Sequence, residues 1–333
     1  MNRAGMRPDQ PTMEQVAELA GVSKITVSRA LRGSDLVRPE VRERIVQVAK
    51  QIGYRVNVAA RSLRTRRSRT VAVVIEQLNR GDRPIADPLL LSMIGGLLEA
   101  LSPAGYAMLL TTNEQFIAGN ALGAEGVVVL GEGESGRSLS QIEALALPTI
   151  AWGEPIAGIN VPVIGSANAA GGRQAAQHLI AGGRTSLLFL GDAEHPEVAA
   201  RLAGFREVLA ASTARLVEVM ACPFTSEGGA EAVTRALDAG ADFDGVFAAS
   251  DFIAAGACDA LLARGIDVPG KVAIVGFDDA PIASGHRPQL TSLRQDGAAA
   301  GRALGSAIIA QIEHTAARLD QLPVELIVRE SSC

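Results

Sequence analysis

A short segment that begins at Thr12 constrains this chain more than any other part of it. Thr12 precedes an apolar-periodic run and has Gln15 three residues later, which is the pattern of a capping box at a helix start. Gly21 and Ser23 then interrupt the run, because glycine permits a positive φ and serine can cap a new helix. Residues 24–31 predict that second helix. Two short helices joined by a turn with glycine predict a helix-turn-helix, whose second helix enters the major groove of DNA.

A third helix and a hinge follow in the sequence. Pro39 is a favoured first residue and Gly53 a favoured end, so the segment between them predicts a helix that closes the core of the head. Asn57 can cap one further helical turn, which is too short to be stable alone in water. An apolar Leu63 among arginines suits insertion between base steps in the minor groove.

Charge is divided unevenly along the chain. Residues 1–70 hold 15 Lys and Arg against 6 Asp and Glu, a net charge of +9. Residues 71–333 hold 16 against 30, a net charge of −14. The overall charge of −5 therefore hides a basic head on an acidic body, which is the asymmetry of a nucleic-acid-binding module tied to a second function.

Composition excludes several other classes of protein. The chain has 333 residues, more than one typical domain, and its 48% hydrophobic content supplies a core that is mostly aliphatic, since aromatic residues are 3%. Cys222, Cys258 and Cys333 are widely spaced and form no metal-ligand pattern, which indicates free thiols in a reducing compartment. Neither a signal peptide nor an apolar run of membrane-spanning length is evident. We expect a cytoplasmic protein without a membrane partner, a metal or a cofactor.

The rest of the chain alternates between apolar strands and amphipathic helices. Short apolar runs predict strands at residues 71–75, 106–110, 126–130, 148–152, 186–190, 216–220, 245–249 and 272–276. Helical spacing predicts helices at residues 87–102, 169–181 and 197–211, with others from about 226 and 251. This alternation predicts parallel, doubly wound sheets, and its restart near residue 165 implies two α/β subdomains. Ligands in such sheets bind at the carboxyl ends of the strands.

The head carries a resemblance to a known family. The pattern Val-Ala-x-x-Ala-Gly-Val-Ser-x-x-Thr-Val-Ser-Arg at residues 16–29, the Gly53-Tyr54 pair and the segment from Asn57 to Leu63 resemble the LacI/GalR, or lactose-repressor, family of transcription regulators. In the body, similar landmarks are RLAGF at 201–205, AIVGFDD at 273–279 and LPVELIVRES at 322–331. The resemblance covers essentially the whole chain.

This resemblance implies an architecture. We expect an N-terminal all-α helix-turn-helix head with a hinge helix, and an α/β body of two doubly wound parallel-sheet subdomains like a periplasmic binding protein. The expected ranges are a disordered arm at 1–11, a DNA-binding domain at 12–56, a hinge helix and linker at 57–70, and an effector-binding and dimerisation domain at 71–331. In the body, the N-subdomain covers about 71–164 and 296–321, and the C-subdomain about 165–295 and 322–331.

The resemblance also assigns DNA-contacting residues. Lys24, Ile25 and Arg29 match the base-reading positions of the family. Arginine can bond guanine O6 and N7 together, and isoleucine can touch a thymine methyl. The other expected contacts are Thr12, Ser23, Thr26, Ser28, Asn57, Ala60, Arg61, Leu63 and Arg64. Helix capping alone would explain the hydroxyl residues and Asn57, and the cations could be solvated surface residues.

An effector site is expected between the subdomains. Arg201 and Asp278 match positions that hydrogen-bond a small molecule, although a structural ion pair or strand-end cap would also explain them. The remaining expected residues, some of which could equally be core, are Leu89, Trp152, Phe224 and Ser250. Gly153 and Ser166 stand where many family members have Asp. A less acidic pocket that keeps Arg201 favours a sugar acid over a neutral sugar.

These features predict a ligand-responsive regulator, most simply a repressor. It would bind a pseudo-palindromic operator in double-stranded DNA as a homodimer, with a sugar or sugar acid shifting its DNA affinity. Segment 112–123 is too short for the helix that relatives place there, at an edge often used in dimer contacts. The alternative is a solute-binding protein for a small sugar-like ligand. An enzyme is not expected, because no nucleophile–base pair or phosphate-cradling loop is present.

Overall fold

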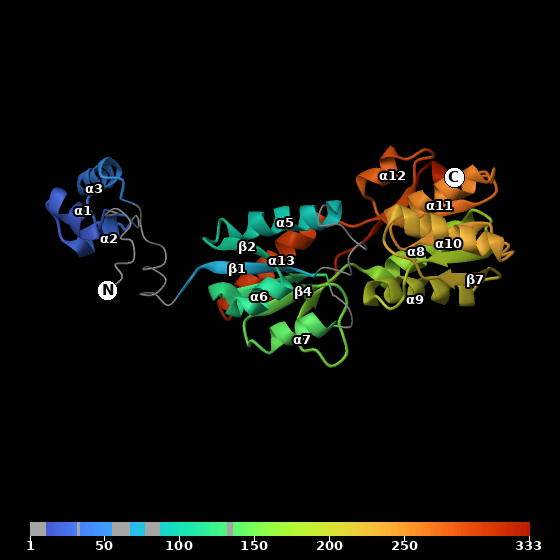
Figure 1. Ribbon diagram of the computed structural model, residues 1–333, viewed down its shortest axis with the longest axis horizontal. Helices are drawn as coiled ribbons and strands as arrows, with labels where there is room; N and C mark the ends of the chain where they lie inside the picture. The colour runs from blue at the N-terminus through green and yellow to red at the C-terminus, as the bar shows by residue number, and fades with distance from the viewer. Residues whose placement is uncertain (1–10, 32–33, 55–66, 77–86, 132–135) are drawn as a thin grey trace, which may run out of the picture. The chain divides into compact units, whose positions relative to one another are not determined.

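The computed structural model describes residues 11–31, 34–54, 67–76, 87–131 and 136–333. It divides into two compact units, residues 1–68 and residues 69–333, which we call the head and the body. The described part of the head consists of the helices α1 (Met13–Leu19), α2 (Lys24–Ala30) and α3 (Pro39–Gln51) (Figure 1). None of the described helices in either unit is long and apolar enough to cross a membrane.

The turn between α1 and α2 depends on a glycine. Gly21 has a φ of +62°, where side chains with a Cβ are strained. Its amide donates to the carbonyl of Glu18 at 3.1 Å, and the amide of Val22 donates to the carbonyl of Ala17 at 3.0 Å. These two bonds satisfy carbonyls that the end of α1 leaves open. The predicted helix-turn-helix is therefore confirmed, down to the residue that makes its turn.

The three helices of the head share one small core. Val16, Val27 and Ile45 are fully buried in it, one from each helix. Pro39 begins α3 as predicted, although the preceding Arg38 makes no side-chain cap. Of the hinge helix and linker expected at 57–70, residues 57–66 lie outside the described residues.

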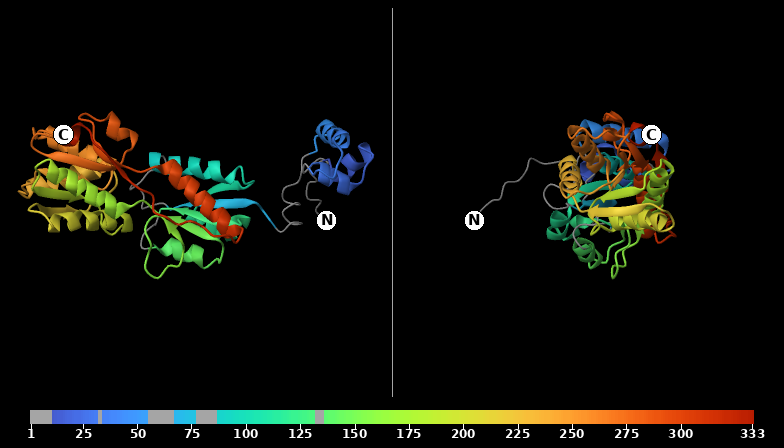
Figure 2. Two further views of the ribbon diagram at one scale, coloured as in Figure 1. Left: turned by 180° about the vertical axis from the view of Figure 1, so that it is seen from behind. Right: turned by 90° about the vertical axis from the view of Figure 1, so that its right-hand side faces the viewer.

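The first subdomain of the body is a five-stranded parallel sheet in the order β2-β1-β3-β4-β5. Its strands are β1 (Thr70–Ile75), β2 (Ala107–Thr112), β3 (Gly126–Leu130), β4 (Thr149–Trp152) and β5 (Val163–Ile164). Its helices are α5 (Pro88–Leu101), α6 (Asn113–Ala118), η1 (Asn120–Gly123), α7 (Arg137–Glu143) and α13 (Gly297–Ile312). Helices α5 and α13 lie together on one face of the sheet, with α6 and α7 on the other (Figures 1 and 2).

The second subdomain is a six-stranded sheet in the order β11-β10-β9-β8-β6-β7, parallel except for β11. Its strands are β6 (Ser186–Leu190), β7 (Arg215–Met220), β8 (Gly245–Ala248), β9 (Ala273–Asp278), β10 (Thr291–Arg294) and β11 (Glu325–Ile327). Its helices are α8 (Asn168–Ala181), α9 (Pro196–Ala210), α10 (Ser226–Asp238), α11 (Asp251–Ala263), α12 (Pro281–Gly285) and η3 (Glu330–Ser332). The chain passes between the subdomains after β5, after β10 and after α13.

Helices α8 and α9 touch through their backbones. A Cβ on Gly172 would lie 1.9 Å from the carbonyl oxygen of Arg201, and a Cβ on Gly204 would lie 1.9 Å from that of Ala169. Side chains larger than hydrogen would force the two helices apart. Because α9 carries Arg201, this close approach also sets the position of the Arg201 backbone relative to α8.

Replacing Gly172 with alanine is expected to destabilise the body by about 3 kcal/mol, since the added methyl overlaps backbone that cannot rotate away. Urea unfolding of the variant measures the loss. The control is Gly182→Ala at the end of the same helix, where the nearest atom to an added Cβ is 3.4 Å away. That control should stay within about 0.5 kcal/mol of wild type. Equal stability of the two variants would show that α8 and α9 are not in backbone contact.

Candidate DNA-reading head and effector site

Two of the expected DNA contacts act as helix caps in the structure. The Thr12 hydroxyl accepts from the Gln15 amide at 3.3 Å, and the Gln15 side chain accepts from the Thr12 amide at 2.8 Å. The Ser23 hydroxyl accepts from the Thr26 amide at 3.2 Å and lies 2.8 Å from the Thr26 hydroxyl. These bonds begin α1 and α2. Capping is thus a sufficient reason for Thr12 and Ser23, and their DNA contacts stay predictions.

The outer face of α2 presents the expected base-reading side chains to solvent. Lys24, Ile25 and Arg29 are exposed, whereas Val27 and Ala30 on the opposite face are buried. Ile25 is 64% exposed, so its side chain is open to a partner molecule. Ser28 is half-buried between the two faces.

The hinge residues cannot be placed in the same way. Asn57, Ala60, Arg61, Leu63 and Arg64 lie outside the described residues. Their expected roles as hinge cap, lever and phosphate contacts stay predictions from the sequence.

Arg201 is the centre of a buried polar network at the carboxyl ends of the second sheet. It is 3% exposed. Its Nε donates to Asn168 Oδ1 at 2.9 Å, and its Nη1 donates to the carbonyl of Ala249, directly after β8, at 2.5 Å. Its guanidinium lies 3.7 Å from the ring centroid of Phe277, the residue before Asp278. The structure thus brings Arg201 to the ends of β8 and β9, where a ligand of such a sheet would bind.

Asn168 extends this network to the first subdomain. Its Nδ2 donates at 2.8 Å to Glu154, which follows β4. Burial raises the pKa of Glu154, as does the nearby carboxylate of Glu197, while the bond from Asn168 and the charge of Arg201 lower it. Glu154 therefore lies close enough to Arg201 and to Glu197 to interact electrostatically with each of them.

Asp278 is held in an unusual backbone conformation at the end of β9. It is 7% exposed and has a φ of +110°, a region that residues with a Cβ rarely adopt. Its Oδ1 accepts from Gln295 Nε2 at 2.5 Å, and Ser166 in turn bonds Gln295 Oε1. Ser166 and Gln295 lie on two of the three crossovers between the subdomains. The carboxylate therefore bonds a residue on one crossover, which in turn bonds a residue on another.

The other expected effector residues take a mixture of positions. The Ser250 hydroxyl accepts from the Ile253 amide at 3.3 Å and so caps α11. Phe224 is 4% exposed and meets the ring of His195 edge-on, with 5.5 Å between centroids. Trp152 is the last residue of β4 and half-buried, whereas Leu89 is packed into the core of the first subdomain. Effector contacts of these four residues stay predictions.

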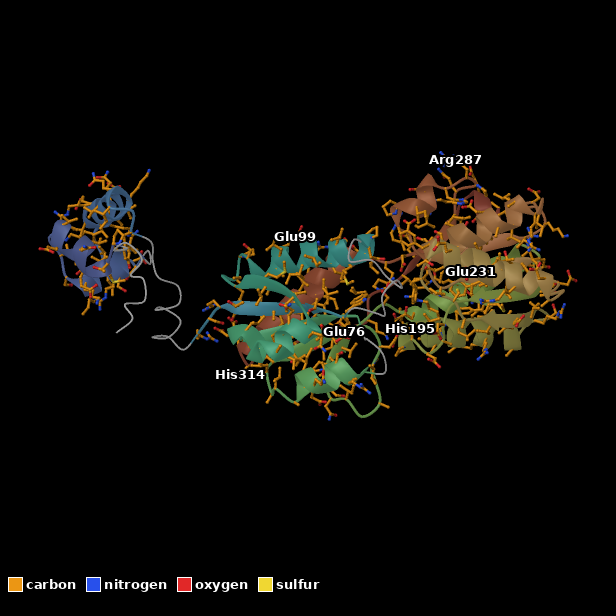
Figure 3. The ribbon with its side chains drawn as sticks, viewed as in Figure 1. Glu76, Glu99, His195, Glu231, Arg287 and His314 are labelled. Carbon is orange, nitrogen blue, oxygen red and sulfur yellow. The ribbon has the colours of Figure 1, made fainter. Side chains whose placement is uncertain are left out.

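Sequence reasoning missed several polar residues that follow strands of the two sheets. They are Glu76, Glu154, Asn168, Glu197 and Gln295. Glu76 follows β1 directly, and burial raises the pKa of its carboxyl despite a bond from Ser138. Figure 3 labels Glu76 on the first subdomain and His195 on the second. Only their positions could have indicated them in the sequence, because each one closely follows a strand or begins a helix.

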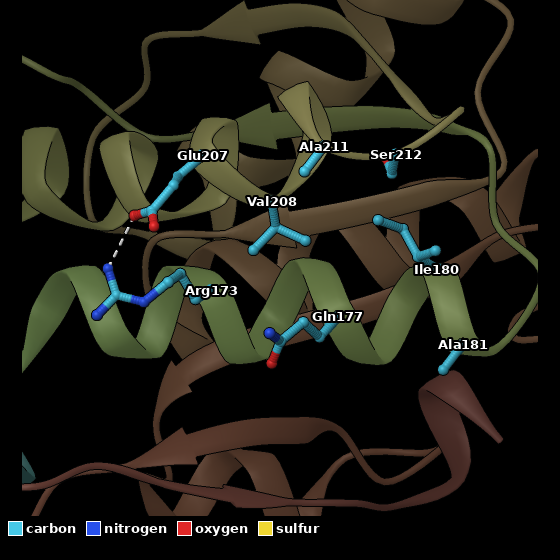
Figure 4. Close-up of a pocket in the computed structure, with 8 residues that line it drawn as sticks. All are labelled: Arg173, Gln177, Ile180, Ala181, Glu207, Val208, Ala211 and Ser212. Atoms are coloured by element: carbon cyan, nitrogen blue, oxygen red, sulfur yellow. Dashed lines mark hydrogen bonds and ion pairs between the residues drawn. The ribbon is translucent and has the colours of Figure 1, made fainter.

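Two features lie apart from this network. A groove of about 450 Å³ runs between α8 and α9, with an ion pair of 3.0 Å between Arg173 and Glu207 across it (Figure 4). It is lined by Arg173, Gln177, Ile180, Ala181, Glu207, Val208, Ala211 and Ser212, none of which was expected to bind effector. Over the described ranges, no cluster of three potential metal ligands occurs.

Comparison with known proteins identifies the family. A model of the bacterial regulatory proteins of the lacI family matches residues 12–57, and a model of the periplasmic binding protein-like domain matches residues 176–332. The HTH-type transcriptional regulator CelR of Thermobifida fusca is 35% identical in an alignment of 340 positions, which covers 98% of this chain and 99% of that protein. This chain belongs to the LacI family. Its members are transcriptional regulators and not enzymes, as expected.

Other relatives agree with the LacI-family assignment. The HTH-type transcriptional regulator GntR of Pseudomonas aeruginosa is 31% identical over 97% of this chain and 96% of its own. A solved complex of the regulator CelR with cellobiose is 32% identical and covers 97% of this chain and 100% of its own, with a TM-score of 0.73. A lac repressor dimer bound to operator and the anti-inducer ONPF has a TM-score of 0.85 over 97% of this chain and 99% of its own. Because the two chains are only 21% identical, this structural likeness shows a shared fold alone.

Proposed function

We propose that this LacI-family regulator is a repressor that binds a pseudo-palindromic operator as a homodimer and responds to a small carbohydrate. The observation that carries the proposal is the outward face of α2. It offers two cations and an exposed isoleucine on a helix that follows a glycine turn and is capped by Ser23. Such a surface suits guanine edges, a thymine methyl and flanking phosphates. The solute-binding alternative leaves this surface without a role.

An apolar surface on the first subdomain supports the homodimer. Leu91 and Leu98 lie two turns apart on α5, and each is 50% exposed. Leu110 on the neighbouring edge strand β2 is 47% exposed. Several exposed leucines on neighbouring elements of one subdomain suit a contact surface. A second copy is the partner that fits, since two heads on a symmetric dimer can read the two halves of a palindrome.

The charges around Arg201 favour a neutral sugar over a sugar acid. Glu154 lies near the one guanidinium, Glu197 lies near Glu154, and Asp278 adds a further carboxyl at the strand ends. An additional anion would meet more negative than positive charge there. The hydroxyls of a neutral sugar can instead donate to these carboxyls while Arg201 and Asn168 orient the site. The relative solved with cellobiose is consistent with this class of ligand.

The ligand would act by changing the relation of the two subdomains. Asn168 joins Glu154 of the first subdomain to Arg201 of the second, so a ligand that competes for these groups biases one arrangement over another. That bias would reach the hinge and the heads, because β1 leads into the body directly from residues 67–69. Thermodynamic reciprocity then requires operator DNA to change ligand affinity by the same factor.

Leu63→Ala tests the hinge. The variant is expected to weaken operator binding about tenfold or more, because a methyl group cannot hold open an unstacked base step. Its ligand affinity should be unchanged, since residue 63 is not part of the body. Fluorescence anisotropy with a labelled duplex measures the first quantity and calorimetry the second. Operator affinity equal to wild type would show that Leu63 is no lever.

Selection from a randomised duplex pool tests the DNA-binding proposal as a whole. The full-length protein should enrich an inverted repeat, and its affinity for the enriched duplex should fall steeply with salt. Enrichment of no sequence, or of a single unrepeated site, would contradict a symmetric dimer of reading heads.

A further inference from the structure

An ion pair joins the first two helices of the head on their exposed side. Lys24 Nζ, at the start of α2, donates to Glu14 Oε1, in the first turn of α1. The side chains are 58% and 61% exposed, so both remain open to a partner molecule. The bond to Lys24 is the main cause of a lowered pKa for the Glu14 carboxyl, which therefore stays ionised near neutral pH.

Half-buried Tyr54 lies beside the pair. Burial raises the pKa of its phenol, and the carboxylate of Glu14 raises it further while the ammonium of Lys24 lowers it. Tyr54 follows α3, so the pair between α1 and α2 also lies within electrostatic reach of the segment after α3.

A carboxylate beside a lysine on a DNA-reading helix lowers the affinity for DNA. Phosphates supply most of the sequence-independent attraction, and a lysine in an ion pair contributes less to it. Glutamate meets only acceptors along a phosphate backbone, so it is repelled there. A favourable contact of Glu14 with a base edge would offset this repulsion.

We propose that Glu14 is a specificity residue, which with Lys24 forms a donor–acceptor unit that favours a G·C pair and disfavours non-specific DNA. This inference rests on the proposed role of α2 in DNA reading. In the major groove, guanine offers the acceptors O6 and N7, and cytosine of the same pair offers its N4 donor. The ammonium of Lys24 matches guanine and the carboxylate of Glu14 matches cytosine. An A·T pair presents a different order of groups, and a phosphate matches only the lysine.

The matched variants Glu14→Gln and Glu18→Gln test this role. Both remove one exposed negative charge from α1, but only Glu14 is in the ion pair with Lys24. For the full-length protein, Glu14→Gln should bind a non-operator duplex roughly fivefold to tenfold more tightly than wild type at 0.1 M salt, and its salt slope should steepen by about 0.9. Operator affinity should rise less or fall, so the ratio of the two affinities drops. Glu18→Gln should keep the wild-type ratio.

Repeating the duplex selection with Glu14→Gln gives a second test. The selected sequence would not change if Glu14 had a purely structural role. We expect the preference for G·C to weaken at one position in each half-site, with the other positions retained. Unaltered melting temperature and helical content of the head confirm that the variant is folded. An affinity ratio and a selected sequence equal to those of Glu18→Gln would overturn the inference. The proposed function fails separately, if wild-type protein selects no inverted repeat.

Discussion

Leu98→Asp is expected to convert the protein to a monomer and to weaken operator binding at least roughly 100-fold. The aspartate places a charge among the exposed leucines, which are Leu91, Leu98 and Leu110. A dimer would have to bury that charge without a partner. Operator affinity falls with the dimer because two linked heads bind about 10²–10⁴ times more tightly than one.

Sedimentation velocity at micromolar concentration and anisotropy with the selected operator measure the two effects. Leu319→Asp is the matched control, since Leu319 is 43% exposed and lies outside α5 and β2. It should remain dimeric and bind operator as wild type does. A dimeric Leu98→Asp with normal operator affinity would mean that the homodimer uses another surface.

Arg201→Met is expected to abolish the response to ligand while leaving DNA binding within about threefold of wild type. Methionine fills part of the space over Phe277 but cannot bond Asn168 or the carbonyl of Ala249. Ligand affinity should fall roughly 100-fold or more, and stability by roughly 2–4 kcal/mol, because buried partners lose their donor. The head is a separate unit and should be unaffected.

Arg173→Met is the matched control, because it removes an arginine that is not part of the network around Arg201. Arg173 lies on the adjacent helix α8 in an exposed ion pair with Glu207, and such pairs contribute little to stability. That variant should unfold within about 0.5 kcal/mol of wild type and keep its ligand response. Retained response in Arg201→Met would place the effector site elsewhere in the body.

Much of this architecture could be predicted from local sequence. The strand expected at 126–130 and the helix expected from 251 are found there, since buried apolar runs and caps are strong signals. The pattern gave no sign of β5 or α7, because two strand residues or seven helical ones carry little periodicity. Segment 112–123 folds as α6 and η1, and Phe116 anchors it by complete burial.

The polar network was harder to predict than the fold. Resemblance identified Arg201 and Asp278, but the absence of Asp at 153 and 166 suggested a less acidic site than the structure contains. Glu154 directly follows Gly153, one of the two positions without Asp, and folding brings it to Asn168. Which polar residues meet is decided by crossovers between the subdomains, and these have no local sequence signature. Likewise, nothing in the sequence indicated that Glu14 would pair with Lys24 ten residues later.

The most direct test of the account measures operator affinity of the full-length protein with and without a saturating ligand found by thermal shift. A panel of neutral sugars and sugar acids is suitable, since a ligand at 100 times its Kd adds about 2.7 kcal/mol of stability. We predict that a neutral sugar stabilises the wild type but not Arg201→Met, and changes operator Kd by roughly fivefold or more. Stabilisation by sugar acids alone would contradict the assigned ligand class. A ligand that stabilises the body yet leaves operator Kd unchanged would contradict ligand-controlled DNA binding itself.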